Sequence, residues 1–288
     1  MTATLAPPAR GFGARIARSP IHVVLLVVSV IWMLPILGLV VSSFRPGPAV
    51  SATGWWRLSV GELTFENYRR VFARNGLFTS MVNSFAIAVP ATALTICIAA
   101  VAAYGLARFQ FRLHTPILML LIGLLVVPAQ ITLVPLLRLF NTFELTGTFR
   151  GVWFVHVGYS LPFAIYLLHN FFSELPSEIF EAASVDGAND AQIFFRMVLP
   201  LSRPAIASLA IFEFVWNWND LLIALIYLGG RRDVAPLTVS ITNLVASHGE
   251  GWQLLTSAAF ISMALPLVVF FTLQRYFVGG ILAGSVKG

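Results

Sequence analysis

The chain has 288 residues, of which 58% are hydrophobic and only 10% are charged. Soluble globular domains average about 45–50% apolar and about 25% charged residues, and the mean hydropathy here is +0.85. This composition excludes a soluble enzyme, a disordered chain and a fibrous protein, and it predicts an all-α, polytopic membrane protein. The net charge of +6 comes from cations scattered between apolar segments. That pattern indicates anchoring at lipid headgroups and no nucleic-acid partner.

A membrane-spanning helix needs about 20 mostly apolar residues, and six segments meet this requirement. In chain order they are residues 21–41, 81–107, 115–137, 151–172, 204–228 and 255–278. They form one membrane domain, residues 21–278, between an N-terminal tail (1–20) and a C-terminal tail (279–288). The first segment is longer than the roughly 7–15 apolar residues of a cleaved signal peptide, so we expect a retained signal-anchor helix.

Proline lies inside five of these spans and is expected to kink each of them. The prolines are Pro35, Pro90, Pro128, Pro162 and Pro266. Kinked helices around a cavity suit a transporter, but they also occur in inert bundles. Six spans place both termini on one side, and the 18 Lys and Arg residues divide evenly between the two sides. The N-terminal arginines and the tight Arg108–Arg112 turn favour termini inside.

The loop at residues 173–203, between the fourth and fifth spans, carries helix-capping signals. Pro176-Ser177 offers an N-cap for a first short helix, and Gly187 is a natural C-terminal stop. Asn189 with Gln192 predicts a capping box for a second helix, which Pro200 is expected to end. Apolar residues at helical spacing give both helices an apolar stripe: Ile179, Phe180, Ala183, Ile193, Phe194, Met197 and Val198.

Small residues beside a carboxylate make this loop suitable for docking a partner. Ala182 and Ala183 permit close approach, and Glu181 can pair with a cation. The alternative is an amphipathic helix lying on lipid headgroups. The loop holds more acidic than basic residues, which is the wrong sign for anionic lipid.

Polar residues inside the spans are the candidates for a substrate pathway. Glu213 and Asp220 are seven residues apart in the fifth span and are expected on one helical face, near Asn217 and Asn219. Carboxylates and amides can donate to and accept from hydroxyl groups, and Trp216 and Trp218 offer aromatic faces for stacking. The alternative is interhelical hydrogen bonding. Weaker candidates are Gln130 and Asn83 with Ser84, whereas polar packing is the preferred interpretation of His156, His169 and Asn170. Cys97 is interpreted as a small core residue.

Glu181-Ala182-Ala183, then Gly187, then Leu199-Pro200 resembles the EAA loop of permease subunits of bacterial ABC importers. The family usually has Ile where this chain has Met197. Further segments resemble the maltose-type second permease of carbohydrate importers, and the resemblance covers roughly residues 20–288. They are LTFENYRRVF (63–72), Asn83-Ser84, AAYGLARFQF (102–111), LPSEIFEAASVDGA (175–188), WNWNDLLIALIYL (216–228) and LQRYFVGGILAGSVKG (273–288).

The resemblance implies a multi-pass subunit of the bacterial inner membrane with both termini cytoplasmic. Its implied partners are a second permease, two ATPase subunits and an extracytoplasmic sugar-binding protein. ATP and Mg²⁺ would be bound by the ATPases, and this chain would bind no cofactor or metal. The EAA loop would be a cytoplasmic coupling helix, with contacts from Glu178, Glu181, Ala182, Ala183, Asp186 and Gly187. Residues 229–254 would face the binding protein, with Gly229-Gly230 and Ser247-His248-Gly249 as flexible ends. The C-terminal tail, which is small and flexible and includes Gly284 and Lys287, would reach the ATPases. In the maltose-type arrangement the partner permease supplies most sugar contacts.

Three other classes of function remain open from the residues alone, and one of them, a non-transporting membrane scaffold, has no feature in its favour. An ion-driven secondary transporter or channel has no reason to carry an EAA-like loop, and no repeat relates the two halves of the chain. A membrane enzyme would need a catalytic constellation at membrane depth, and Glu213 and Asp220 are expected about 10 Å apart along one helix. A phosphate-binding loop of the type that holds ATP is absent from the sequence.

Overall fold

The computed structural model describes residues 12–57, 60–74, 76–248 and 251–285. Within these ranges every regular element is helical. Four helices are long and apolar enough to cross a membrane, and two strongly bent helix pairs raise the number to six. The four are α1 (Phe12–Ser43), α4 (Leu77–Arg108), α7 (Phe149–Ser173) and α14 (Trp252–Ser285). The predicted all-α, polytopic architecture is confirmed.

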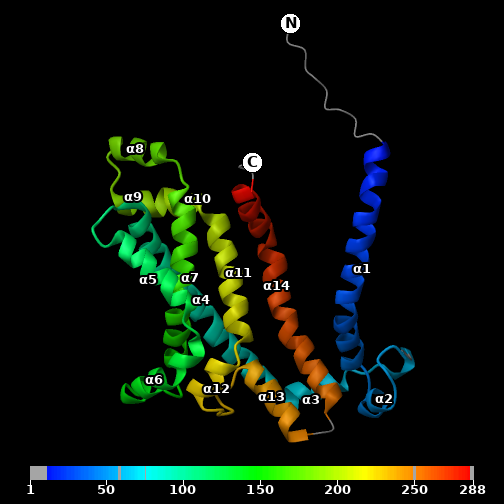
Figure 1. Ribbon diagram of the computed structural model, residues 1–288. Helices are drawn as coiled ribbons and strands as arrows, with labels where there is room; N and C mark the ends of the chain where they lie inside the picture. Colours follow the sequence, from blue (N-terminus) through cyan, green and yellow to red (C-terminus); the bar gives the residue numbers. More distant parts are fainter. Residues whose placement is uncertain (1–11, 58–59, 75, 249–250, 286–288) are drawn as a thin grey trace.

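The short helices gather at the two ends of the bundle (Figure 1). One end carries α8 (Ser177–Val185), α9 (Asp190–Ile193) and α10 (Leu199–Leu201), beside the last turns of α14. The opposite end carries α2 (Gly47–Ala52), a 3-10 turn (Val60–Glu62), α3 (Glu66–Arg74), α12 (Leu222–Leu228) and α13 (Leu237–His248). We call these the α8 end and the α13 end.

The third span is broken, which corrects the prediction of one kinked helix over residues 115–137. It consists of α5 (His114–Val126) and α6 (Ala129–Thr142), whose axes meet at 101°. Val127 is extended because it precedes Pro128, and Pro128 itself has no N–H to continue the helix. At the other four predicted kink sites the helix continues through the proline.

The fifth span also ends earlier than predicted. Helix α11 runs from Arg203 to Asn219, and Asp220 adopts an extended conformation before α12 begins at Leu222. The Asp220 carboxylate accepts hydrogen bonds from the backbone N–H groups of Ile223 (3.3 Å) and Ala224 (2.9 Å). A carboxylate that satisfies the first N–H groups of α12 favours a new helix start over a continuous helix. Glu213 and Asp220 therefore do not share one helical face.

Helix α1 stands beside the bundle and is fixed at its C-terminal end (Figure 1). Only 6% of its most apolar stretch is buried, as expected of a helix that faces lipid or a partner. At the α13 end, the Ser43 carbonyl accepts hydrogen bonds from Asn67 Nδ2 (2.9 Å) and Ser257 Oγ (2.9 Å). These bonds tie the end of α1 to α3 and α14.

Helices α4 and α7 form the centre of the bundle. The buried face of α4 is rich in alanine, which lets the two helices approach closely. It includes Ala88, Ala91, Ala99, Ala100 and Ala103. Cys97 lies on the other face and is exposed, so its interpretation as a core residue is wrong.

Both predicted tails are partly helical. Helix α1 begins at Phe12, and α14 continues through the predicted flexible tail to Ser285. The glycines at 279, 280 and 284 do not interrupt α14, because no proline follows and each backbone N–H can still reach the preceding turn. Residues 1–11 and the final 286–288, including Lys287, lie outside the described residues.

Candidate functional site

The loop between α7 and α11 is built by local capping. The Ala188 N–H donates to the Ala183 carbonyl (3.0 Å) and the Gly187 N–H to the Ser184 carbonyl (3.1 Å). Gly187 has φ +81°, so these bonds form the paired Schellman motif that ends α8. Asn189 and Gln192 form the predicted capping box, with bonds of 3.0 and 2.9 Å. The two short helices are thereby held at a fixed turn.

Two details of this loop differ from the prediction. Pro176 is the N-cap of α8, and no side chain caps it, because Ser177 is already the first helical residue. Pro200 does not end the second helix. A π turn (Phe194–Val198) precedes it, and the helix continues to Leu201. The wider turn relieves the clash between the proline ring and the preceding turn of backbone.

Helix α8 has one buried face and one exposed face. Phe180 and Ala183 are buried against Ile193, Phe194 and Val198, which confirms the predicted apolar stripe. The end of α4 supports this cluster: the Arg108 guanidinium lies 5.4 Å from the Phe180 ring centre, and the Tyr104 hydroxyl donates to the Asp190 carbonyl (3.3 Å). The short helices are therefore packed rigidly onto a membrane-spanning helix.

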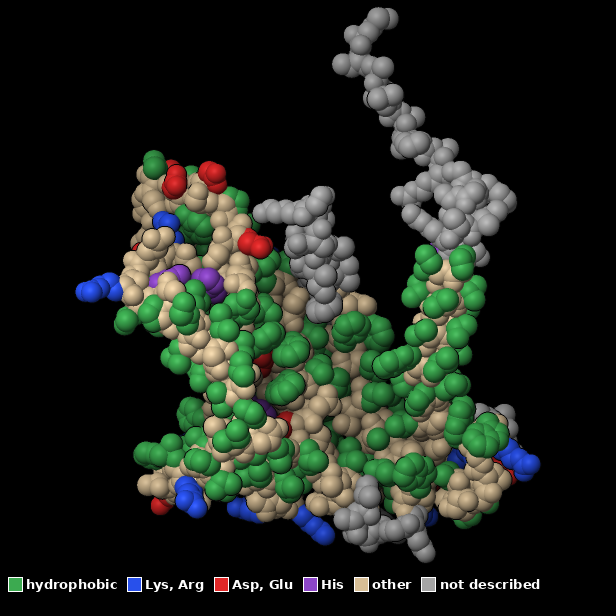
Figure 2. All heavy atoms as spheres, viewed as in Figure 1, with side chains coloured by type: hydrophobic (Ala, Val, Ile, Leu, Met, Phe, Trp, Pro, Cys, Tyr) green, Lys and Arg blue, Asp and Glu red, His purple; other side chains and the backbone are tan. Residues whose placement is uncertain are grey.

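The exposed face of α8 carries most of the residues predicted to contact a partner. We call it the acidic face, and it consists of Glu178, Glu181, Ala182, Val185 and Asp186. Acidic side chains are visible over α8 in Figure 2. The prediction that Ala183 contacts a partner is wrong, because its side chain is 8% exposed and packs into the core. Val185 was missed by the sequence argument, yet it is 88% exposed and adds an apolar contact to this face.

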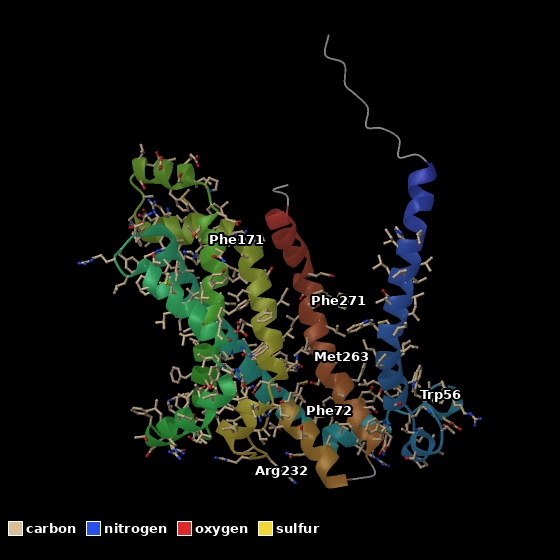
Figure 3. The ribbon with its side chains drawn as sticks, viewed as in Figure 1. Trp56, Phe72, Phe171, Arg232, Met263 and Phe271 are labelled. Carbon is tan, nitrogen blue, oxygen red and sulfur yellow. The ribbon has the colours of Figure 1, made fainter. Side chains whose placement is uncertain are left out.

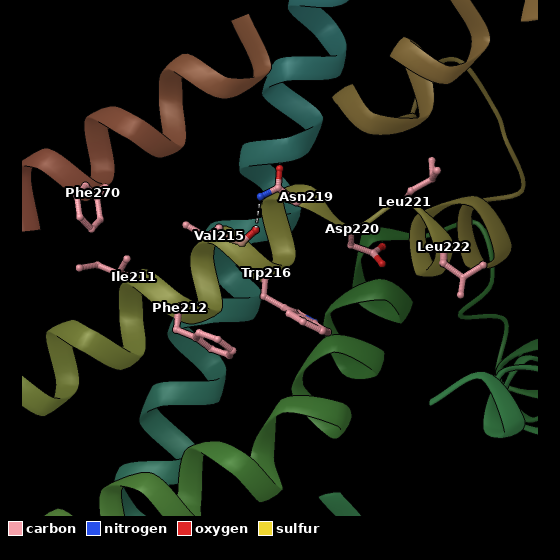
Figure 4. Close-up of a pocket in the computed structure, with 9 residues that line it drawn as sticks. All are labelled: Ile211, Phe212, Val215, Trp216, Asn219, Asp220, Leu221, Leu222 and Phe270. Atoms are coloured by element: carbon pink, nitrogen blue, oxygen red, sulfur yellow. Dashed lines mark hydrogen bonds between the residues drawn. The ribbon is translucent and has the colours of Figure 1, made fainter. Parts of the chain in front are cut away.

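Two of the cavities that adjoin α11 hold most of the predicted pathway residues. The Gln130 cavity has a volume of about 980 Å³ and lies between α5, α6, α7 and α11. Its polar wall is formed by Gln130, Thr132, Tyr159, Ser160 and Glu213. The Asn219 cavity, of about 620 Å³, lies between α11, α12 and α14 and includes Asn219 and Asp220 (Figure 4). Trp216 and Phe212 line both cavities and separate them.

Glu213 is the one predicted pathway residue that is both deeply buried and lines a cavity. Its side chain is 1% exposed and lies beside Ser160 of α7. Its Oε2 has no hydrogen-bond partner among the described residues. An unpaired buried carboxylate oxygen is costly, and Glu213 also lines the Gln130 cavity, so turning this buried oxygen toward the cavity would let it accept from a hydroxyl there.

Asn83 and Asn217 line neither cavity, and each makes hydrogen bonds that hold two segments of the bundle together. Asn217 Nδ2 donates to Thr92 Oγ1 (3.1 Å), which joins α11 to α4. Asn83 Nδ2 donates to the carbonyls of Asp233 (3.0 Å) and Ala235 (3.1 Å). The sequence argument could not separate these two asparagines from the pathway group, because an amide suits either role.

We expect Asn83→Ala to destabilise the protein by about 1–3 kcal/mol, since it leaves two carbonyl groups, of which that of Ala235 is buried, without their donor. Thermal unfolding in detergent measures the loss. Asn141, an exposed residue of α6, provides the control, and Asn141→Ala should leave the unfolding temperature unchanged. An equal shift in both variants would show that the Asn83 bonds do not stabilise this region.

His156 of α7 is more closely connected to the candidate site than predicted. It is 1% exposed, and its Nε2 lies 3.8 Å from Asp220 Oδ2. Asp220 therefore faces α7 and caps α12 at the same time. His169 and Asn170, by contrast, contact each other near the end of α7, with 3.4 Å between Nδ1 and Oδ1.

The segment after α12, whose ends were predicted to be flexible, contains a helix of its own. Gly229 and Gly230 both have φ +70°, so they do form a turn, but helix α13 follows. Ser80 and Ser240 hydroxyls are 2.6 Å apart, and the Leu237 N–H donates to Ser84 Oγ (2.8 Å), which attaches α13 to α4. In the exposed turn, the Arg231 guanidinium holds the pKa of Asp233 below its usual value. Gly249 lies outside the described residues.

Comparison with known proteins identifies the family. The family described as "Binding-protein-dependent transport system inner membrane component" matches residues 11–282. The osmoprotective compounds uptake permease GgtD of Synechocystis is 51% identical over 93% of this chain and 92% of its own length. The alpha-glucoside transport system permease AglG of Rhizobium meliloti is 50% identical over 78% of this chain and 60% of its own.

Among solved structures, a bacterial ABC transporter that imports the polysaccharide alginate contains a chain of the same fold. The TM-score is 0.81 with 21% identity, and the match covers 94% of this chain and 100% of that chain. This likeness concerns the fold, whereas the sequence matches establish kinship. The chain thus belongs to the family of inner membrane components of binding-protein-dependent transport systems.

Proposed function

We propose that this chain is one permease subunit of an ATP-driven carbohydrate importer, and that the acidic face of α8 receives the ATPase. The observation that carries the proposal is the rigid attachment of α8. Its buried face packs on α4 and on the residues leading into α11, while its opposite face exposes carboxylates. A helix capped at Gly187 and packed in this way can transmit a displacement without bending.

The proposed division of labour follows from the family. A second permease completes the translocation pathway, and two ATPase subunits bind at the α8 end, where they hold ATP and Mg²⁺. Glu181 would form a charge-assisted pair with a cation of the ATPase, of about 1.5–3 kcal/mol when desolvated. This places the α8 end in the cytoplasm, together with both termini.

The α13 end would then face outward, toward a sugar-binding protein. Exposed cations in the turn between α12 and α13, Arg231 and Arg232, lie at this end. Figure 3 shows Arg232 there, far from α8. The helix α13, anchored to α4, offers a stable contact surface between the two ends that were expected to be flexible.

The substrate we propose is a small carbohydrate of the α-glucoside class. Support comes from AglG, a relative at 50% identity whose name specifies alpha-glucoside transport. The melibiose/raffinose/stachyose import permease MelC of Bacillus subtilis (32% identical) and the trehalose transport permease SugB of Mycobacterium tuberculosis (35% identical) also carry names of glycosides. The polar groups of the Gln130 cavity suit hydroxyls.

Uptake by the whole importer tests this function. The tagged chain is purified with its partner subunits, reconstituted in proteoliposomes, and supplied with the binding protein and a labelled α-glucoside. We expect uptake that requires ATP inside the vesicles and persists when a protonophore is added. Uptake that needs an ion gradient but no ATP would contradict the proposal and favour a secondary transporter.

A further inference from the structure

Three cavities follow one another along α11. The Asn170 cavity, of about 360 Å³, lies between α7 and the start of α11 and includes Asn170, Glu174 and Ser208. It shares Phe163 with the Gln130 cavity, and the Gln130 cavity shares Phe212 and Trp216 with the Asn219 cavity. The row runs from Asp220 toward the α8 end, where Phe171, another residue of the Asn170 cavity, is seen in Figure 3.

The residues shared between neighbouring cavities are all aromatic. The ring centres of Phe163 and Phe212 are 5.1 Å apart, and those of Phe212 and Trp216 are 6.2 Å apart with planes only 19° from parallel. We call these three side chains the ring ladder. Trp216 is 59% exposed and Phe212 is 48% exposed, so their faces are open to an occupant. In Figure 4 the two rings project in the same direction from successive turns of α11.

Hydrogen-bonding groups accompany the ladder along its length. At its middle lies Glu213, whose buried carboxylate has an unpartnered Oε2 within the described residues, and across the cavity lies the exposed Gln130. Asn219 and Asp220 lie at one end of the row, and Asn170 with Glu174 lies at the other. A lipid-facing row of rings would gain nothing from a buried carboxylate beside it.

Aromatic faces and hydroxyl acceptors together match the two sides of a pyranose ring. A pyranose presents an apolar face of C–H groups, which packs on an aromatic ring, and a rim of hydroxyls, which needs acceptors. One platform would bind the sugar in place. Several rings in a row let the sugar pass from one ring to the next without losing apolar contact, which keeps each binding step weak enough for release.

We propose that the ring ladder is a sliding track for pyranosides inside this subunit, with the Glu213 carboxyl group turning toward the cavity to accept a sugar hydroxyl at its midpoint. The proposal rests on the carbohydrate import proposed above and gives this chain sugar contacts of its own. This differs from the maltose-type arrangement that the resemblance implies, in which the partner permease supplies most of the sugar contacts.

Transport per ATP hydrolysed tests the track in the reconstituted full importer. Trp216→Leu and Phe212→Leu keep apolar bulk but remove the ring face. We expect sugar transport to fall by about three- to tenfold in each variant, while ATPase activity stimulated by the binding protein is retained. Trp216→Phe should restore more than half of the rate. Glu213→Gln, which keeps the shape but removes the acceptor charge, should lower transport to a similar extent.

Phe78→Leu is the matched control, because Phe78 is an exposed aromatic residue of α4 that lines none of these three cavities. It should transport within about twofold of the unaltered importer. Normal coupling in both ladder variants would overturn the track and leave carbohydrate import intact. Loss of the second permease during purification of these variants would also overturn it, since the rings would then be an interface between subunits. Failure of the unaltered importer to move any carbohydrate would instead contradict the proposed function.

Discussion

Replacing Gly187 by valine should uncouple ATP hydrolysis from transport while the membrane-spanning helices remain inserted. Gly187 has φ +81°, and an added Cβ would meet no described atom within 4 Å. The cost is therefore backbone strain alone, about 1–2 kcal/mol for a side chain in the left-handed region. Relief of that strain breaks the Schellman motif and releases α8 from its fixed angle. Sugar uptake and ATPase activity, measured on the same vesicles, report the uncoupling.

Gly123→Val is the control for the Gly187 substitution. Gly123 lies within helix α5, and a Cβ there also meets no described atom within 4 Å. The same side chain is thus introduced into open space without the left-handed conformation. Transport should stay close to normal in this control. Full transport by Gly187→Val, with ATPase subunits bound, would show that the angle of α8 does not matter for coupling.

Asp220→Ala should destabilise the α13 end and abolish efficient transport. The substitution removes the acceptor for the N–H groups of Ile223 and Ala224 and leaves His156 without its facing carboxylate. The loss of a helix cap costs about 0.5–2 kcal/mol, which corresponds to a fall of about 1–8 °C in Tm for a chain of this size. Thr238 Oγ1 also donates to the Asp220 carbonyl (2.6 Å), so disorder at this position reaches α13.

Asp220→Asn separates the cap from the charge. Asparagine retains one oxygen acceptor for α12 but no anion for His156. We expect its Tm to lie between those of the unaltered protein and Asp220→Ala. Asp233→Ala, which alters an exposed carboxylate in the neighbouring turn, should change Tm little. If Asp220→Ala unfolds at the unaltered temperature, the capping role of Asp220 is contradicted.

The local features of this protein were predictable from sequence because they depend on neighbouring residues. The Gly187 turn and the Asn189–Gln192 capping box need only a few consecutive residues, and both were predicted correctly. The apolar stripe of α8 also correctly indicated that Ala183 is buried. Assigning Ala183 to the docking surface as well was inconsistent with that stripe.

The helix breaks were harder to predict because apolar runs continue across them. Leu221–Leu228 is as apolar as the helix before it, so the length of the apolar run predicted one continuous span. A signal was present, since Asn219-Asp220 is a pair of residues that favour caps over helix interiors. The same applies to Pro128, where the proline was noted but a complete break was not inferred.

The cavities and their ring ladder could not be predicted, because they depend on which helix faces pack together. Phe163 and Phe212 are distant in sequence, and their contact arises from the packing of α7 against α11. Asn217 and Glu213 are one turn apart on the same helix, yet only Glu213 lines a cavity. From residue type alone, both Asn217 and Glu213 were predicted to line the substrate pathway.

We propose that the acidic face of α8 lies in the cytoplasm and is covered by the ATPase. The accessibility of residue 185 tests this most directly. Val185→Cys is made with Cys97→Ser, which removes the single natural cysteine, and is probed with a membrane-impermeant maleimide. Ala183→Cys, at a buried position of the same helix, is the control for unspecific labelling. We expect labelling of residue 185 only in inside-out vesicles, and loss of that labelling when the ATPase subunits are bound. Labelling in intact cells, or equal labelling with and without the ATPase, would contradict it.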